Sequence, residues 1–457
     1  MTPLHLRGPA PPAVTHPRRA LLAGSAGNFV EWYEFGVYGC FATVIAARFF
    51  TPDTATGPAG AGPLLATYAS FAVAFFFRPV GALLFGRLGD RVGRRPTLIL
   101  VVCLMTAATA LIGLLPTRAT AGELASWLLT LLRALQGLSA GGEFGGAVAL
   151  MTESAPPGRR GRHGAWQFFT VALGLLAGAG TAAAIAGVLT PPALYDWGWR
   201  IPFLLALPLG AVALWLRTGL TEPAGAHRLE GLPGTTPETP PARPAPDPGT
   251  VGAGPVAPTP PATARTVVLG IGRIMGWSAA GYTFLVVLPS YLQATLGASF
   301  QEALIATTVA NLGFAAAILP AGILSDRVGR RPVMLCGALC VTLLALPLLH
   351  LLQDPAASAP AKAAGLLGAG AAVGLLAGPG PAMLAEMFPA SVRCTGLGLA
   401  YALANAVFSG CAGLVVTALI AATGNTDVPA HYAAGACALS AVALASLRPD
   451  DHLRPLR

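Results

Sequence analysis

The sequence predicts an all-α membrane protein with twelve transmembrane helices, arranged as two pseudo-symmetric six-helix halves. The first observation is composition: 54% of the 457 residues are hydrophobic and 10% are charged, whereas a soluble domain carries about 25% charged residues. The second is length, because a transmembrane helix needs about 20 apolar residues and this chain holds enough for about twelve. The third is a loop sequence that occurs twice. An ordinary cytosolic enzyme is therefore excluded.

Twelve apolar stretches fill most of the chain and are separated by polar loops. They are too long for the strands of an outer-membrane barrel, which alternate polar and apolar residues over about ten positions. Each stretch is therefore predicted to be a helix. The predicted helices cover residues 20–49, 64–85, 97–115, 124–151, 164–189, 201–216, 267–292, 303–324, 333–352, 363–384, 395–422 and 432–447.

A segment rich in proline and glycine separates the sixth predicted helix from the seventh. Its sequence PETPPARPAPDPGTVGAGPVAPTPPATAR offers almost nothing to bury, which is typical of a disordered or polyproline-like linker. The first apolar stretch contains two glutamates and is too long for the core of a signal peptide. The predicted organisation is a cytoplasmic tail (1–19), a first six-helix bundle (20–217), a disordered cytoplasmic linker (218–265), a second six-helix bundle (266–447) and a cytoplasmic tail (448–457).

The net charge of +9 does not indicate nucleic-acid binding, because the basic residues stand in short clusters between apolar stretches. Cytoplasmic loops of membrane proteins collect arginine and lysine. If the N-terminus is cytoplasmic, 21 of the 28 basic residues lie on the cytoplasmic side, 4 on the opposite side and 3 within spans. This distribution predicts that both termini are cytoplasmic.

The repeated loop is GRLGDRVGRRP at residues 86–96 and GILSDRVGRRP at residues 322–332, identical at nine of eleven positions. A second repeat aligns Glu153 and Arg160 with Glu386 and Arg393. Two six-helix units that each carry a basic loop after the second helix indicate a parallel internal repeat, a feature of secondary transporters.

Four segments carry a resemblance to a known family: GNFVEWYEFGVYG (27–39), FFFRPVGALLFGRLGDRVGRRP (75–96), RALQGLSAGGEFGGA (133–147) and EMFPASVRCTGLGLAYALAN (386–405). The sequence resembles the major facilitator superfamily, and within it the metabolite:proton symporter branch. Two features depart from the family pattern: Glu34 stands where the family usually has aspartate, and the central linker is proline-rich rather than charged and partly helical.

The resemblance implies a secondary active transporter that imports a small polar metabolite with protons by alternating access, in a bacterial inner (plasma) membrane. It implies organic carboxylates or zwitterions as substrates, with membrane lipid, the substrate and protons as partners, and a monomer. The alternative is a proton-antiport exporter of drugs or metabolites. A sensor on this fold that binds without transporting is a further alternative.

An enzyme is not expected, because the sequence has no phosphate-binding loop of the G-x-x-x-x-G-K-[ST] type, no cluster of metal-ligating histidines and no nucleophile elbow. No cofactor, metal or nucleic acid is predicted as a partner.

Charged and polar residues within predicted helices are expensive in a bilayer and mark functional sites. Asn28, Glu31, Glu34 and Tyr38 are spaced so that they share one side of the first helix, which should face the central cavity. We expect Glu34 to carry the coupled proton and Glu31 to serve structure or substrate. The alternative is a structural ion pair. The remaining substrate-binding candidates are Arg78, Arg133, Gln136, Tyr282, Tyr401 and Asn405, for which helix packing is the alternative role.

The resemblance also implies a cytoplasmic gate in which the repeated acidic residues and their arginines hold the two halves together. The repeated aspartate is not explained by the positive charge of cytoplasmic loops. Glu153–Arg160 and Glu386–Arg393 are expected as neighbouring charges. The predicted gate residues are Asp90, Arg91, Arg94, Asp326, Arg327, Arg330, Glu153, Arg160, Glu386 and Arg393.

Overall fold

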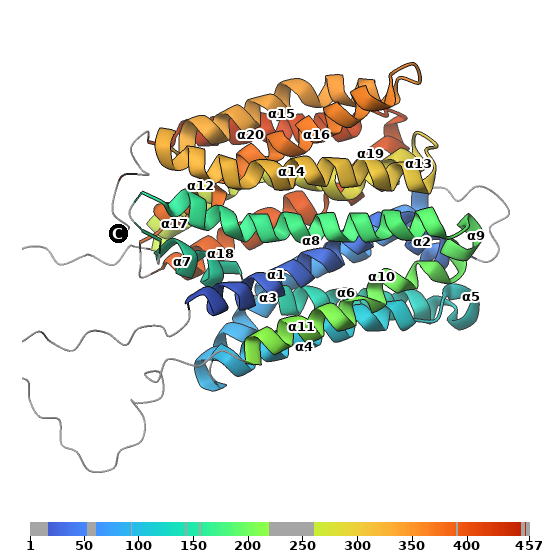
Figure 1. Ribbon diagram of the computed structural model, residues 1–457, viewed down its shortest axis with the longest axis horizontal. Coiled ribbons are helices and arrows are strands. Elements are labelled where there is room, and N and C mark those ends of the chain that lie inside the picture. The colour runs from blue at the N-terminus through green and yellow to red at the C-terminus, as the bar shows by residue number, and fades with distance from the viewer. Residues whose placement is uncertain are drawn as a thin grey trace, which may run out of the picture.

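The computed structural model describes residues 17–52, 61–92, 94–141, 144–153, 155–156, 158–218, 260–389, 392–448 and 453. Within these ranges the chain is helical and contains no strand. The long helices lie side by side along the long axis of the molecule (Figure 1). This arrangement confirms the predicted all-α membrane fold.

The first half forms six helical columns, several of them interrupted by π-helical turns or breaks. Its elements are α1 (Pro17–Cys40), α2 (Ala42–Ile45), η1 (Ala46–Phe50), α3 (Ala61–Val92), α4 (Arg94–Leu114), α5 (Arg118–Ala121), α6 (Glu123–Ala140), α7 (Phe144–Glu153), α8 (Arg160–Val188), α9 (Pro191–Ala193), η2 (Leu194–Gly198), α10 (Arg200–Leu204) and α11 (Ala206–Thr218).

The second half repeats this plan. Its elements are α12 (Pro260–Tyr282), η3 (Thr283–Val287), α13 (Leu288–Ala294), α14 (Phe300–Val328), α15 (Arg330–Gln353), α16 (Ala359–Ala377), α17 (Gly380–Met387), α18 (Arg393–Ala404), η4 (Asn405–Gly410), α19 (Ala412–Thr423) and α20 (Val428–Ala445).

Two helices start within segments predicted as tail or linker. α1 begins at Pro17, three residues before the predicted first helix, and α12 begins at Pro260, within the predicted linker. A proline in the first turn is compatible with a helix because its missing N–H has no intrahelical acceptor there. Most of the predicted linker and tails, at 1–16, 219–259, 449–452 and 454–457, lies outside the described residues.

Ten helices of the described ranges are long and apolar enough to cross a membrane. The other two predicted spans are α1 with α2 and η1, and α6 with α7. Each carries charged or amide side chains in its middle, Glu31 and Glu34 in α1 and Arg133 and Gln136 in α6, which lower its mean hydropathy.

The lipid-facing surface is made of large apolar side chains that a soluble protein would bury. Trp127, Trp215, Leu343 and Val442 are among the exposed examples. Because the outermost helices of both halves carry such residues, the bundle is a multi-pass membrane protein rather than a soluble helical domain.

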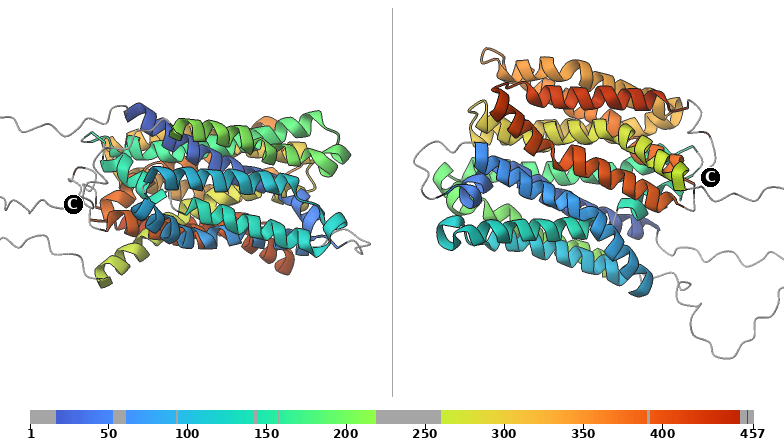
Figure 2. Two further views of the ribbon diagram at one scale, coloured as in Figure 1. Left: turned by 90° about the horizontal axis from the view of Figure 1, so that it is seen from below. Right: turned by 180° about the vertical axis from the view of Figure 1, so that it is seen from behind.

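The two halves meet along several pairs of helices from opposite halves. α8 packs against α14 and α17, α3 against η4 and α19, α1 against η3 and α13, and α7 against α17 and α18. The right-hand view of Figure 2 shows α3 running beside the α18–α19 column.

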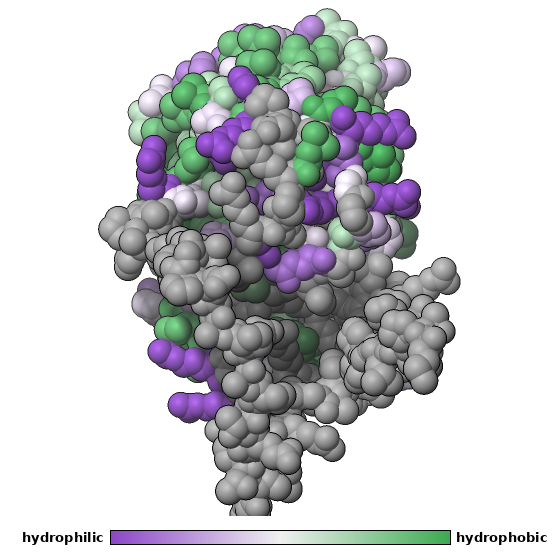
Figure 3. All heavy atoms as spheres, turned by 90° about the vertical axis from the view of Figure 1, so that its left-hand side faces the viewer, coloured by the Kyte–Doolittle hydropathy of each residue, from purple (hydrophilic) through white to green (hydrophobic). Residues whose placement is uncertain are grey.

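We call the end where α3 meets α4 and α14 meets α15 the basic end, and the opposite end, near Thr51 and Thr295, the far end. Exposed arginines stand at the basic end, among them Arg91, Arg159, Arg162 and Arg327. Hydrophilic side chains are visible on this face in Figure 3.

Candidate functional site

A buried ion pair joins α1 to α3 near the middle of the first half. Arg78 Nη2 donates to Glu31 Oε1 at 3.0 Å, and both side chains are less than a tenth exposed. The guanidinium carbon of Arg78 lies 4.4 Å from the ring centroid of Phe75 and 4.7 Å from that of Phe35. These rings leave the ion pair in a surrounding of low polarity, where removal of one partner would cost about 3–5 kcal/mol.

Arg133 of α6 lies fully buried in an aromatic box. Its guanidinium carbon is 4.1 Å from the ring centroid of Tyr38, 4.8 Å from Phe71 and 4.9 Å from Phe35. Nη1 donates to Gln136 Oε1 at 2.7 Å. Nε and Nη2 have no hydrogen-bond partner among the described residues, and these two N–H groups form one edge of the planar guanidinium.

Glu34 is also completely buried, and neither carboxyl oxygen has a hydrogen-bond partner in the part of the chain that the structure describes. The Thr109 hydroxyl of α4 is a neighbour of this carboxyl group, but it donates its single proton to the Met105 carbonyl oxygen at 3.0 Å. It accepts a hydrogen bond from Gln136 Nε2 at 2.6 Å. Thr109 and Gln136 thus connect the surroundings of Glu34 to Arg133.

The four polar residues of the first helix do not share one environment. Asn28 Nδ2 donates to the Gln167 carbonyl oxygen at 3.0 Å and to Thr170 Oγ1 at 2.6 Å. Asn28 therefore joins α1 to α8, within the first half. The Tyr38 hydroxyl lies 2.6 Å from Ser70 Oγ of α3.

The carboxyl group of Glu31 lies beside Arg78 of α3 and that of Glu34 beside Thr109 of α4, both in the first half. Glu31 also lies within electrostatic range of Tyr282 and Tyr401, which line the centre between the halves. That this side of α1 faces a central substrate cavity stays a prediction.

The centre between the two halves holds a cavity of only about 30 Å³, lined by Trp32, Phe168, Tyr282, Tyr401 and Asn405 among others. Such a volume holds about one or two water molecules, so the centre is closed to any metabolite in this conformation.

Several polar groups at the centre lack a partner. The Tyr282 hydroxyl, the Trp277 Nε1 and the Asn311 Oδ1 have no hydrogen-bond partner among the described residues. Asn405 Nδ2 donates to the Tyr401 carbonyl oxygen at 2.9 Å. Buried polar groups normally find partners, and of these residues Trp277, Tyr282 and Asn405 line the central cavity.

Ion pairs between the halves close the basic end. Arg393 of the second half donates to Glu153 of the first at 2.5 Å. Arg160 of the first half lies 3.8 Å from Glu386 of the second, which also binds Arg330 at 3.0 Å. The sequence predicted Glu153–Arg160 and Glu386–Arg393 as neighbouring charges, and the structure pairs Arg160 and Arg393 each with the glutamate of the opposite half.

Asp326 joins this network through the N-terminus of α8. Its two carboxylate oxygens accept from the backbone N–H groups of Gly161 and Arg162 at 2.7 and 2.9 Å, and Arg330 donates to it at 2.7 Å. A carboxylate is favoured at a helix N-terminus, where backbone N–H groups lack intrahelical acceptors. This contact spans the two halves.

Two further predicted gate residues, Arg91 and Arg327, take no part in these contacts. Arg91 and Arg327 are exposed, and neither has an ion pair with another described residue. The side chains of Asp90 and Arg94 lie outside the described residues.

Sequence reasoning missed aromatic and hydroxyl groups of the site. Phe144 of α7 stacks on Tyr401 of α18 with ring centroids 3.4 Å apart, and Thr109 lies beside Glu34. Threonine and phenylalanine are common in apolar helices, so no local signal distinguishes these positions. Their roles depend on contacts with distant helices.

Two repeated six-helix halves, closed by ion pairs at one end and carrying buried charges inside, define a transporter of small molecules. Residues 20–222 match the family described as "Sugar (and other) transporter", and residues 267–456 match the "Major Facilitator Superfamily".

Similar proteins of known name are transporters. The chain is 35% identical to the ectoine/proline transporter ProP of Corynebacterium glutamicum, over 93% of this chain and 83% of the relative. It is 35% identical to the alpha-ketoglutarate permease of Escherichia coli, over 88% and 87%. It is 34% identical to the citrate-proton symporter of Klebsiella pneumoniae, over 90% and 88%.

A crystal structure of the D-xylose-proton symporter has the same fold, with a TM-score of 0.72 and 18% identity over 96% of this chain and 99% of that chain. The xylose transporter XylE from E. coli in a partially occluded, inward-open conformation gives a TM-score of 0.69 at 16% identity, over 93% and 96%. The chain belongs to the major facilitator superfamily.

Proposed function

We propose that this protein is a proton-coupled symporter that imports a small carboxylate-bearing metabolite by alternating access. The observation that carries the proposal is the pair of buried, incompletely bonded charged groups, Glu34 and Arg133. The relatives named above transport proline and ectoine, alpha-ketoglutarate, or citrate, and each of these compounds bears a carboxylate. Their shared chemistry matches a buried guanidinium.

Arg133 is the proposed receptor for the substrate carboxylate. Its Nε and Nη2 form the edge of the guanidinium that binds a carboxylate through two parallel hydrogen bonds. This edge has no partner among the described residues, while Gln136 occupies Nη1. The aromatic box holds the guanidinium in place, so a substrate reaches it when the surrounding rings move.

Glu34 is the proposed proton carrier. A buried carboxyl group without a donor is more stable protonated than ionised, because burial of an unpaired charge costs several kcal/mol. Once Glu34 loses its proton, its charge competes with the substrate carboxylate for Arg133. Substrate release and proton release are then coupled through one guanidinium.

The transporter changes conformation by opening and closing the two ends of the molecule. The basic end is closed by contacts between the halves, and their loss opens it, which is the rocking motion of repeat-based transporters. We place the basic end in the cytoplasm, with both termini, because of the arginine distribution. Glu31 and Arg78 stabilise α1 against α3 throughout.

Uptake in liposomes tests the proposal. The purified protein is reconstituted, and radiolabelled proline, glycine betaine, alpha-ketoglutarate and citrate are offered with and without an imposed pH gradient, acidic outside. Accumulation of at least one compound that depends on the gradient is the expected result. Efflux of substrate in exchange for entering protons, with no uptake, would instead establish the alternative of a proton antiporter.

A further inference from the structure

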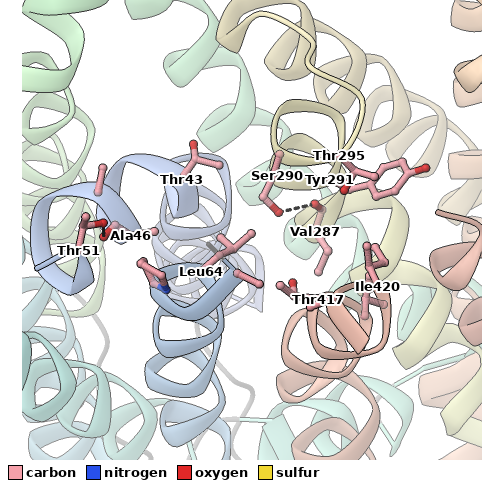
Figure 4. Close-up of a pocket in the computed structure, with 16 residues that line it drawn as sticks. Thr43, Ala46, Thr51, Leu64, Val287, Ser290, Tyr291, Thr295, Thr417 and Ile420 are labelled. Carbon is pink, nitrogen blue, oxygen red and sulfur yellow. Dashed lines mark hydrogen bonds between the residues drawn. The ribbon is translucent and has the colours of Figure 1, made fainter. Parts of the chain in front are cut away.

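A second cavity lies between the halves at the far end and is not part of the site described above. It encloses about 320 Å³, near the lower limit of the roughly 300–1,000 Å³ typical of small-molecule sites. The first half contributes η1 and the start of α3, and the second contributes α13 and α19 (Figure 4). Its hydroxyl-bearing lining residues are Thr43, Thr51, Ser290, Tyr291, Thr295 and Thr417.

The lining is polar without being charged. No Asp, Glu, Lys, Arg or His is found among the residues that line the cavity within the described ranges. Hydroxyl groups donate and accept hydrogen bonds, so they can replace water around a polar solute. A solute with net charge gains no opposite charge here to offset its lost hydration. The cavity is therefore suited to compact, net-neutral molecules, including zwitterions.

One cavity residue, Ser290, connects this space to the buried charges. Its hydroxyl donates to the Val287 carbonyl oxygen at 2.8 Å, so it accepts from the Tyr68 hydroxyl, 2.5 Å away. Tyr68 of α3 is fully buried and packs edge-on to Phe71, with centroids 6.4 Å apart. Phe71 is one wall of the box around Arg133.

The bond between Tyr68 and Ser290 also crosses between the halves. A second such bond joins Thr43 Oγ1 to Gln293 Oε1 at 2.9 Å. Both bonds are between neutral groups, whereas the contacts that close the basic end involve charged groups. Neutral hydrogen bonds are weaker than charge-assisted ones, so the far end is the end that a bound solute can open.

We propose that the far-end cavity is an entry site that binds the transported solute in a net-neutral form, and that Ser290 couples its occupancy to opening of the Tyr68 contact. The inference rests on the proposed transport function. A solute whose polar group takes the Ser290 hydroxyl as partner displaces Tyr68, which frees Phe71 and exposes Arg133. Entry is thereby limited to solutes that this cavity accepts.

Protection of an introduced thiol tests the binding site. Thr417→Cys places a thiol in the cavity, and Thr423→Cys places a matched control on the same helix at an exposed position outside the lining. Modification by a membrane-impermeant methanethiosulfonate reagent is followed at each peptide by mass spectrometry. Glycine betaine and proline should each slow modification at position 417 several-fold and leave position 423 unchanged, whereas citrate should have no effect.

The same assay is repeated with Arg133→Ala, which removes the proposed central receptor. Protection by glycine betaine should persist, because the entry site does not include Arg133. Protection that disappears with Arg133→Ala, equal protection by citrate, or no protection by either zwitterion would each overturn the proposal. Because the assay measures binding without a pH gradient, it is independent of whether transport proves to be proton-coupled.

The native thiol of Cys40 reports on the coupling. Cys40 of α1 is buried and is a neighbour of Tyr68, so it becomes reactive when the Tyr68 contact opens. Glycine betaine should raise the modification rate of Cys40 in the parent protein, and Ser290→Ala should raise it several-fold without ligand. Ser290→Thr, which keeps the hydroxyl, should behave as the parent. An unchanged Cys40 rate in Ser290→Ala would refute the coupling.

Discussion

Glu34 and Arg133 differ from Glu31 and Arg78 although all four are buried charged side chains of the first half. Glu31 and Arg78 pair with each other at 3.0 Å, so their charges are already neutralised and stabilise the contact of α1 with α3, although Arg78 Nε has no hydrogen-bond partner among the described residues. Glu34 has no hydrogen-bond partner, and Arg133 has an open edge, among the described residues. Groups that are stabilised only when a ligand or a proton arrives are the ones that can respond to it.

Glu34→Gln should abolish accumulation driven by a pH gradient while substrate exchange across the membrane continues. Glutamine keeps the size and polarity of the side chain but binds no additional proton. Uptake and counterflow in liposomes measure the two activities separately. Accumulation equal to that of the parent would exclude Glu34 as the proton carrier.

Arg133→Lys should raise the KM for substrate at least about tenfold, the effect of roughly 1.4 kcal/mol, because an ammonium group cannot form the two parallel hydrogen bonds of a guanidinium. Arg273→Lys is the matched control, since Arg273 is a buried arginine whose Nη2 donates to Ser446 at 2.9 Å, outside the site. Uptake measured as a function of substrate concentration gives the KM of each variant. A KM that changes equally in the two variants would indicate a packing effect.

At the scale of elements, the interface between the two halves near the far end depends on close approach of α3 to α19. A Cβ atom on Gly413 would lie 2.2 Å from Cδ1 of the Tyr68 ring. Real Cβ atoms do not approach so closely, so the glycine is required for the Tyr68 ring to lie against α19. In the sequence, the π-helical turns η3 and η4 of the second half stand close to the residues of this contact. Such a turn changes which face of the helix the following residues occupy.

Gly413→Ala should therefore displace Tyr68 and lower the stability of the protein by about 1–3 kcal/mol, the usual effect of overpacking. Gly435→Ala is the control, because a Cβ atom there meets nothing within 4 Å. Thermal unfolding in detergent compares the variants. A Gly413→Ala protein as stable as the Gly435→Ala protein would contradict the packing argument.

The turn between α19 and α20 is held to α15 by Asp427. Gln353 Nε2 donates to Asp427 Oδ1 at 2.9 Å, and His350 Nε2 lies 3.3 Å from Oδ2. The hydrogen bond from Gln353, followed by those with His350, lowers the pKa of Asp427. A carboxyl group whose pKa is lower in the folded state stabilises the protein at pH values above its unfolded pKa.

Asp427→Asn should therefore lower the Tm at pH 7, and the difference from the parent should shrink as the pH falls below the ordinary aspartate pKa of 3.8. Gln353→Ala, which removes the hydrogen bond from Gln353 to Asp427, should also lower the Tm at pH 7. Thermal unfolding from pH 7 to pH 3 provides the comparison. A Tm difference that grows as the pH falls below 3.8 would reverse the assigned sign.

At the scale of the whole molecule, the two ends are closed by different chemistry. The basic end uses ion pairs and a helix N-terminus, and the far end uses neutral hydroxyl bonds and aromatic packing. Glu386 is almost buried while Glu153 is about half exposed (6% and 47%). Glu386 contacts Arg160 of the opposite half and also holds Arg330, which donates to Asp326 at the N-terminus of α8. Loss of a buried partner costs several kcal/mol, so removal of Glu386 would disturb two contacts between the halves, whereas removal of Glu153 would disturb one.

Glu386→Gln should therefore shift the protein toward conformations open at the basic end more strongly than Glu153→Gln does. Both substitutions keep the shape of the side chain and remove one charge. Modification of a thiol introduced at Ala382, a buried residue of α17 that faces Gly164 of α8, measures that opening. The ranking would be refuted if Glu153→Gln had the larger effect.

Much of the whole-molecule plan was accessible from the sequence. Hydropathy predicted a helical membrane protein, and the loop repeat predicted two similar halves, because both signals are carried by neighbouring residues. The buried positions of Glu31, Glu34, Arg78 and Arg133 were also expected from their places within apolar stretches. Their individual functions remain predictions.

Only the tertiary structure decided which groups meet. Arg393 binds Glu153, 240 residues away, and Asn28 is used to join α1 to α8. Ser290 and Tyr68, 222 residues apart, close the far end. Helical spacing and hydropathy are local properties, whereas the partner of a buried charge or hydroxyl depends on which helices pack together. The sequence by itself determined which residues must be buried, and packing decided what each of them contacts.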